Sequence, residues 1–170
     1  MLRRQVRRKP AAPSGKAIAV LRDEINAGLK EAMKGGDKRR VSTLRMINAA
    51  LKDRDIEARG NGREPLNDDE IRALMQKMIK QREESIALYD KAGRKDLATQ
   101  EREEVAIIIA FLPAQLSDVE AGTLITALVK EIGAESLKDM GRTMAALKER
   151  FAGKMDFSKA SATVKSLLKG

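Results

Sequence analysis

Acidic side chains occur in short runs that raise the question of acid–base or metal chemistry. Residues 68–70 are Asp-Asp-Glu, and residues 83–84 and 103–104 are pairs of Glu. Neighbouring positions on a helix point about 100° apart, so the carboxylates within each run do not converge on one point. Glu101 and Glu104 share a helix face, but a two-carboxylate site needs further partners that the sequence does not mark. We therefore predict no catalytic residue and no metal ligand here.

Composition excludes several other kinds of chemistry. The 170 residues include no histidine and no cysteine, which excludes His-based triads, imidazole acid–base catalysis, thiolate metal sites and cysteine nucleophiles. No serine or threonine lies in a nucleophile elbow, and no glycine-rich phosphate loop occurs. The sequence predicts a protein that needs no cofactor, and any enzymatic activity would rest on carboxylates, hydroxyls and amines.

Basic side chains form a dense run near the end of the chain. Residues 142–170 include seven Lys or Arg but only two acids, Glu149 and Asp156. Such a cluster can neutralise phosphates in a salt-dependent way, or it can be a solvated surface that keeps a small domain soluble. Only four aromatic residues occur, which disfavours stacking on single-stranded bases. The residues that we predict to contact RNA phosphates are Arg142, Lys148, Lys154, Lys159 and Lys165.

The first 16 residues hold six of the nine net positive charges and no acid. Three interpretations stay open for them: a basic disordered tail, a start codon placed too far upstream, and part of a mitochondrial transit peptide. The predicted location is cytoplasmic, or the mitochondrial matrix if residues 1–16 belong to a transit peptide. No membrane partner is expected, because the most apolar stretch, residues 105–112, is far shorter than the about 20 residues that span a bilayer.

Apolar residues recur every three or four positions through the rest of the chain, which predicts helices, and no alternating strand pattern of useful length appears. Asp37, Asn67 and Ser117 are the expected N-caps, and Gly93 is an expected C-cap. Positive charge opposes the helix dipole where Lys38, Arg39, Arg40 and Arg45 cluster near one helix start. The predicted helices cover residues 17–34, 37–59, 67–92, 95–111, 117–132, 136–151 and 158–168.

A proline-containing link at Pro113 is the best domain boundary. We predict an all-α fold with an N-terminal long-helix unit followed by a compact three-helix unit. The corresponding segments are the tail over 1–16, an N-terminal helical domain over 17–112 and a C-terminal domain over 113–170.

Several short segments, taken in order, resemble the YqeY family over residues 17–170. The C-terminal part is similar to the tail domain of GatB, the tRNA-binding component of the aspartyl/glutamyl-tRNA amidotransferase. The segments that carry the resemblance are Arg-Met-Ile at 45–47 with Ala-Leu at 50–51, Gln-Arg at 81–82 with Ser85 and Tyr89, Ala-Gly-Arg-Lys-Asp-Leu at 92–97, Phe-Leu-Pro-Ala-Gln-Leu-Ser at 111–117 and Asp-Met-Gly-Arg-Thr-Met at 139–144.

The resemblance implies a helical accessory protein that binds tRNA or another structured RNA without catalysing a reaction. It also carries a family label, carbon–nitrogen ligase activity with glutamine as amido-N-donor, which these residues do not support. The chain has no counterpart of the transferase body of GatB or of an amidase's Ser-Ser-Lys machinery. The alternative is a helical protein-interaction module that binds a translation or tRNA-modifying enzyme.

Overall fold

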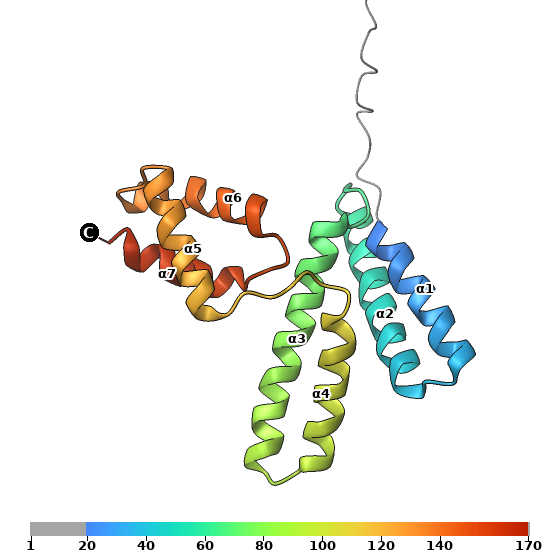
Figure 1. The fold of residues 1–170 in the computed structure, drawn as a ribbon. Coiled ribbons are helices and arrows are strands. Elements are labelled where there is room, and N and C mark those ends of the chain that lie inside the picture. Colours follow the sequence, from blue (N-terminus) through green and yellow to red (C-terminus); the bar gives the residue numbers. More distant parts are fainter. Residues whose placement is uncertain (1–19, 170) are drawn as a thin grey trace, which may run out of the picture.

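Helices make up most of residues 20–169, which are the residues that the computed structural model describes (Figure 1). The all-α prediction is confirmed, and no strand occurs in this part of the chain. None of the described helices is both long and apolar enough to cross a membrane. The elements are α1 (Val20–Gly35), α2 (Lys38–Gly60), α3 (Asp68–Lys91), α4 (Lys95–Ile109), α5 (Asp118–Glu131), the 3₁₀ turn η1 (Leu137–Asp139), α6 (Met140–Phe151) and α7 (Phe157–Leu167).

Local capping contacts begin three of these helices where the sequence predicts them. The Asp37 side chain accepts a hydrogen bond from the Arg40 amide at 3.0 Å, and Ser117 Oγ accepts one from the Glu120 amide at 3.2 Å. Asn67 and Glu70 form a reciprocal capping box with distances of 2.9 and 3.0 Å. These side chains satisfy amide groups that have no partner within the helix.

Two predicted boundaries differ from the structure. The helix predicted over 136–151 begins as the 3₁₀ turn η1 and becomes α-helical only at Met140. The Asp139 carboxylate accepts hydrogen bonds from the Glu135 and Ser136 amides, which holds the chain in a tight turn first. The helix predicted over 95–111 ends at Ile109 and leaves Phe111 in a turn. The predicted start at residue 17, and the whole of the predicted tail, lie outside the described residues.

The first hydrophobic core lies among α1, α2, α3 and α4. Two helix hairpins, α1–α2 and α3–α4, pack against each other and bury side chains from all four helices. The Phe111 ring closes one end, because its Cζ lies 3.1 Å from the position that a side chain on Gly28 would occupy. A glycine in α1 therefore makes room for the aromatic ring. The fully buried large residues of this core include Ile25, Leu44, Ile47, Ile71, Met75 and Ile108.

A second hydrophobic core lies among α5, α6 and α7. Ile125 and Leu128 of α5 meet Leu147 of α6 and Val164 of α7. Leu168 covers the end of the group and is 2% exposed. Each group of helices thus buries its own apolar face.

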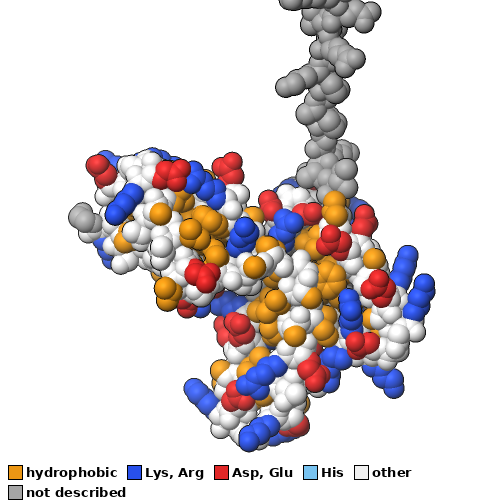
Figure 2. Space-filling view, in the orientation of Figure 1, with side chains coloured by type: hydrophobic (Ala, Val, Ile, Leu, Met, Phe, Trp, Pro, Cys, Tyr) orange, Lys and Arg blue, Asp and Glu red, His pale blue; other side chains and the backbone are white. Residues whose placement is uncertain are grey.

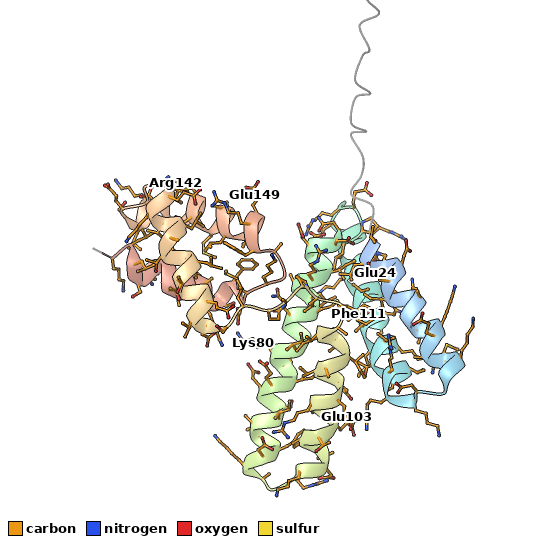
Figure 3. The ribbon with its side chains drawn as sticks, in the orientation of Figure 1. Glu24, Lys80, Glu103, Phe111, Arg142 and Glu149 are labelled. Atoms are coloured by element: carbon orange, nitrogen blue, oxygen red, sulfur yellow. The ribbon has the colours of Figure 1, made fainter. Side chains whose placement is uncertain are left out.

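Polar contacts join the two groups along one stripe of α3. Gln76 Nε2 donates to the Met155 carbonyl at 3.1 Å, and Lys80 Nζ lies 3.5 Å from the Asp156 carboxylate. Figure 3 shows Lys80 extending from α3 toward the α5–α7 group. Arg72 lies on α3 one turn before Gln76, and its side chain packs directly on Gly153.

The link before α5 is fastened to the turn before α7. Gln115 Nε2 donates to the Gly153 carbonyl at 2.6 Å, and the Leu116 amide donates to the Lys154 carbonyl at 2.8 Å. Gln76 also donates to Gln115 Oε1 at 3.3 Å. The junction therefore depends on a few directed hydrogen bonds and on a glycine at the point of closest approach.

We predict that Gly153→Ala loosens this junction. A Cβ there would lie 2.7 Å from Arg72 Cδ, and Gly153 has a φ of +74°, so both the contact and the backbone oppose the substitution. The free energy of unfolding should fall by about 2 kcal/mol or more. Hydrogen exchange at the Leu116 amide should accelerate at the same time.

Gly93→Ala is the matched control. Gly93 has a φ of +69° but nothing within 4 Å of its Cβ position, so only the backbone cost of about 1 kcal/mol applies. Equal losses in the two variants, measured by urea unfolding, would show that the Arg72 contact does not hold the junction.

Candidate nucleic-acid interface

The acidic pair Glu101 and Glu104 is neutralised by a cation from the neighbouring helix. Arg82 of α3 places Nε 2.9 Å from Glu104 Oε2 and 3.8 Å from Glu101 Oε2. The Glu104 side chain is 7% exposed and that of Arg82 is 12% exposed. Arg39 of α2 pairs with Glu103 at 3.1 Å and lies 4.0 Å from the other oxygen of Glu104. These contacts give the acids a packing role in joining three helices.

Arg142, the first of the predicted RNA contacts, is engaged within the protein. Its guanidinium donates to Asp139 Oδ1 at 2.9 Å, to the Ile132 carbonyl at 2.7 Å and to the Gly133 carbonyl at 3.0 Å. A cation at the C-terminal end of a helix is favoured by the helix dipole and satisfies carbonyls that lack helical partners. Arg142, at the top of the α5–α7 group in Figure 3, therefore caps α5.

Acids from outside the 142–170 segment neutralise part of its charge. Arg150 forms a two-bond pair with Glu131 of α5, at 2.7 and 2.8 Å, and this contact lowers the pKa of Glu131. Lys159 Nζ lies 3.7 Å from Asp118, also of α5. Both groups of the second pair are largely exposed, so its energy is small and Lys159 stays accessible to a ligand. The excess of seven basic over two acidic residues in the 142–170 segment is thus smaller on the folded surface.

Two of the predicted residues, Lys148 and Lys165, face away from α5. Lys148 is six positions after Arg142, which bonds to the end of α5, and Lys165 is six positions after Lys159, which lies near Asp118 of α5. Six residues rotate about 120° around a helix, so both lysines turn away from the α5 side. Both are exposed. They lie on α6 and α7, which pack against each other.

The remaining predicted residue, Lys154, lies at the junction. It borders a cleft of about 440 Å³, together with Arg72, Glu24 and Asp68 and the ring of Phe111. The structure therefore does not gather the five predicted residues on one surface. Arg142 and Lys159 lie beside α5, Lys148 and Lys165 lie on α6 and α7 about 120° around those helices, and Lys154 lies near α3.

A further row of cations lies on α2 and was not among the predicted contacts. Lys38, Arg45 and Lys52 are exposed and recur every seventh residue, which places them on one face of the helix. Their spacing is readable from the sequence. The net charge of residues 17–60 does not indicate this row, because seven acidic side chains there offset ten basic ones.

Comparison with known proteins identifies the family. The model of the Yqey-like protein family matches residues 22–168. The chain belongs to the YqeY family. Among its relatives, Altered inheritance of mitochondria protein 41, mitochondrial, of Lachancea thermotolerans is 32% identical over 122 residues, which are 68% of this chain and 63% of the relative. The protein of the same name in Eremothecium gossypii is 32% identical over 90 residues, or 53% and 48% of the two chains.

An uncharacterized protein of Schizosaccharomyces pombe is 30% identical over 104 residues, which are 61% of this chain and 80% of that protein. This chain spans about half to under two thirds of the length of the two yeast relatives with mitochondrial names.

The segments that resemble the YqeY family have identifiable structural roles here. Gln115 fastens the link before α5, Gly93 adopts the positive φ that ends α3, and Arg82 neutralises Glu104. Arg142 and Asp139 hold the turn between α5 and α6. In this chain the segments that carry the resemblance therefore include residues that join the helices.

We predict that the Asp139 turn makes stability depend on pH. Hydrogen bonds from the Glu135 amide, the Arg142 guanidinium and the Ser136 amide lower the pKa of Asp139 from 3.8 to about 2. The ionised Asp139 carboxylate therefore stabilises the folded state above pH 3.8. This contribution to the free energy of unfolding is lost as the carboxylate is protonated between pH 3.8 and about 2. The melting temperature of Asp139→Asn should therefore lie below that of the unmodified protein at neutral pH, with the difference shrinking across this window. Glu135→Gln, which removes a neighbouring charge, should show no such convergence, and a constant difference for Asp139→Asn would contradict the assignment.

We also predict that Glu104→Ala destabilises the protein far more than Glu103→Ala. Removing Glu104 leaves the largely buried guanidinium of Arg82 with only the longer contact to Glu101 at 3.8 Å, which costs about 3 kcal/mol. The Glu103 pair with Arg39 is largely exposed and should contribute about 1 kcal/mol or less. Urea unfolding of both variants measures the difference, and similar losses would refute a central role for the buried pair.

Proposed function

We propose that this YqeY-family chain is an accessory protein that binds tRNA or another structured RNA through the phosphates. The observation that carries the proposal is a pair of exposed lysines, Lys148 on α6 and Lys165 on α7, two helices that pack against each other. Lys154 adds a cation at the junction. The resemblance of this unit to a tRNA-binding tail domain supports the same assignment. Binding of this kind needs neither a metal nor a cofactor.

The few aromatic residues support recognition by shape and phosphate contact. Phe151 and Phe157 pack against the second core, and Phe111 packs against the first. These rings are therefore committed to packing, whereas binding to single strands relies on exposed rings that stack on bases. Double-helical RNA is recognised mainly through phosphates, hydroxyls and groove shape.

The proposed function includes no catalytic step. The acidic cluster most suited to acid–base chemistry, around Glu104, is bonded to Arg82. We therefore propose that glutamine-dependent carbon–nitrogen ligase activity is absent from this chain. Release of ammonia from glutamine by the purified protein would overturn that part of the proposal.

We predict that a triple variant, Lys148→Gln, Lys154→Gln and Lys165→Gln, binds unmodified tRNA more weakly. Affinity is measured between about 50 and about 200 mM salt, because contacts to phosphate appear as a dependence on salt. Each lysine that contacts a phosphate should lower the slope of log K against log salt by about one.

The matched control replaces Lys91, Lys95 and Lys138 by Gln, which removes the same charge from exposed positions elsewhere. If the unmodified protein binds tRNA and both triple variants bind it equally weakly, the affinity depends only on the net charge of the protein. No binding of RNA by the unmodified protein at low salt would end the proposal.

A groove between α2 and α3 favours a second candidate, a module that binds a translation or tRNA-modifying enzyme. The groove measures about 510 Å³, and its apolar side chains are those of Met46, Ala50, Leu74 and Met78. Methionines adapt to varied apolar surfaces, and a groove of this type accepts the apolar face of an amphipathic helix. Binding of such a peptide that Ala50→Arg blocks, together with no RNA binding, would replace the first candidate by this one.

The location proposed is the mitochondrial matrix, the second of the two compartments predicted from the sequence. The names of the Lachancea thermotolerans and Eremothecium gossypii relatives include the word mitochondrial. The basic, acid-free composition of residues 1–16 supports the same compartment.

A further inference from the structure

The exposed row on α2 has a regular geometry. Lys38, Arg45 and Lys52 are separated by seven residues each, which corresponds to about 10.5 Å along the helix axis and a drift of about 20° per step. The row therefore follows one face of α2 over about 21 Å. Because an α-helix is stiff, the spacing of the three Cα positions is fixed, while the long side chains let each cation adjust to its partner.

Other faces of α2 contact the first core and α1, and the row lies outside these contacts. Leu44, Ile47 and Leu51 are buried in the first core. Asn48 bonds to Asn26 of α1 at 3.2 Å, and Asp55 bonds to Arg22 of α1 at 2.7 Å. The row lies on neither the core face nor the α1 face of the helix, and its three side chains are exposed.

The ion pairs of α2 use other residues. They are made by Arg39 with α4, by Asp55 with α1, and by Arg54 with Glu57 on α2 itself. Arg59 continues the seven-residue spacing, but the drift of about 20° per step turns it about 60° around the helix from Lys38, toward the face on which Asp55 contacts Arg22 of α1. At the start of the row, Lys30 and Lys34 of α1 add two more exposed cations, and Figure 2 shows Lys and Arg side chains around this end of the α1–α2 hairpin.

Residues interleaved with the row distinguish between two kinds of partner. Ser42, Ala49 and Ile56 occupy the intervening seven-residue positions on the same face, and only Ile56 is large and apolar. A partner helix needs a continuous apolar seam to pack on, which this face lacks. A phosphate backbone needs only cations.

We propose that the row of Lys38, Arg45 and Lys52 on α2 is a docking surface for the phosphate backbone of double-helical RNA. It rests on the RNA binding proposed above and adds a contact on the N-terminal group of helices. A straight row of cations on one helix face lies along the regular phosphate backbone of a double helix without any contact to bases. The partner is thus recognised by backbone geometry and not by base sequence.

The test is a triple variant, Lys38→Gln, Arg45→Gln and Lys52→Gln, of the full chain. Glutamine has a helix propensity close to that of Lys and Arg, and removing Lys38 relieves an unfavourable charge at the helix start. The melting temperature should therefore be unchanged or higher. Affinity for double-stranded RNA at about 50 mM salt should fall by about tenfold or more, and the salt slope by about three.

Controls separate this proposal from the proposed function. The Lys91, Lys95 and Lys138 triple variant removes the same charge, and the Lys148, Lys154 and Lys165 triple variant reports on the C-terminal unit. If the unmodified protein binds no RNA, the proposed function fails. If it binds RNA and the α2 variant behaves like the charge control, the α2 surface is refuted while RNA binding stands.

A comparison of three polyanions tests whether the row on α2 prefers double-stranded RNA. Double-stranded RNA, single-stranded RNA and polyglutamate are compared with the same α2 variant. We expect the largest loss for double-stranded RNA. An equal loss for all three polyanions would overturn recognition of a helical backbone, and a loss confined to polyglutamate would assign the row to an acidic protein.

Discussion

The buried pair of Arg82 and Glu104 fixes how three helices of the first group pack. A carboxylate that is 7% exposed is stable as an anion only beside a cation, because the cost of burying an unpaired charge is several kcal/mol. This requirement holds α3 and α4 in the register that places the two side chains 2.9 Å apart. Arg39 approaches the same carboxylate from α2, so a single buried charge constrains three helices at once.

The orientation of α2 about its own axis brings Arg39 to Glu104. The same orientation determines which charged side chains of α2 are exposed to solvent. Arg39 turns toward α4, and Thr43, one helical turn later, is fully buried. Lys38 is about 100° away around the helix, and Arg45 and Lys52 share its face. The packing of the core and the exposed row on α2 are therefore two consequences of one helix orientation.

Local features of this fold could be predicted from the sequence, and long-range ones could not. The capping box of Asn67 and Glu70 spans three residues, and its signal is contained in those positions. Arg150 finds Glu131 19 residues earlier, and Lys159 finds Asp118 on another helix. A count of charges along a segment omits such partners, which is why residues 142–170 are less basic on the folded surface than in the sequence.

Arg142 illustrates a second limit of sequence reasoning. Its basic character is evident, but its role depends on where the C-terminal end of α5 lies in space, since two of its three contacts are to the carbonyls there. Backbone carbonyls carry no signature in a sequence. The seven-residue spacing of Lys38, Arg45 and Lys52 is visible in the sequence, yet its meaning depends on knowing which faces of α2 contact α1 and the core.

The first turns of α2 and α3 differ in a way that stability alone does not explain. α3 opens with Asp68, Asp69 and Glu70, whose charges the helix dipole favours. α2 opens with Lys38, Arg39 and Arg40, whose charges the same dipole opposes. Arg39 offsets this cost through Glu103 and Glu104. Lys38 makes no such pair among the described residues. Asp37 supplies one carboxylate at this helix start. A local rule broken at an exposed position is expected where a surface serves a partner, and the phosphates of the RNA proposed as that partner would supply further negative charge beside Lys38.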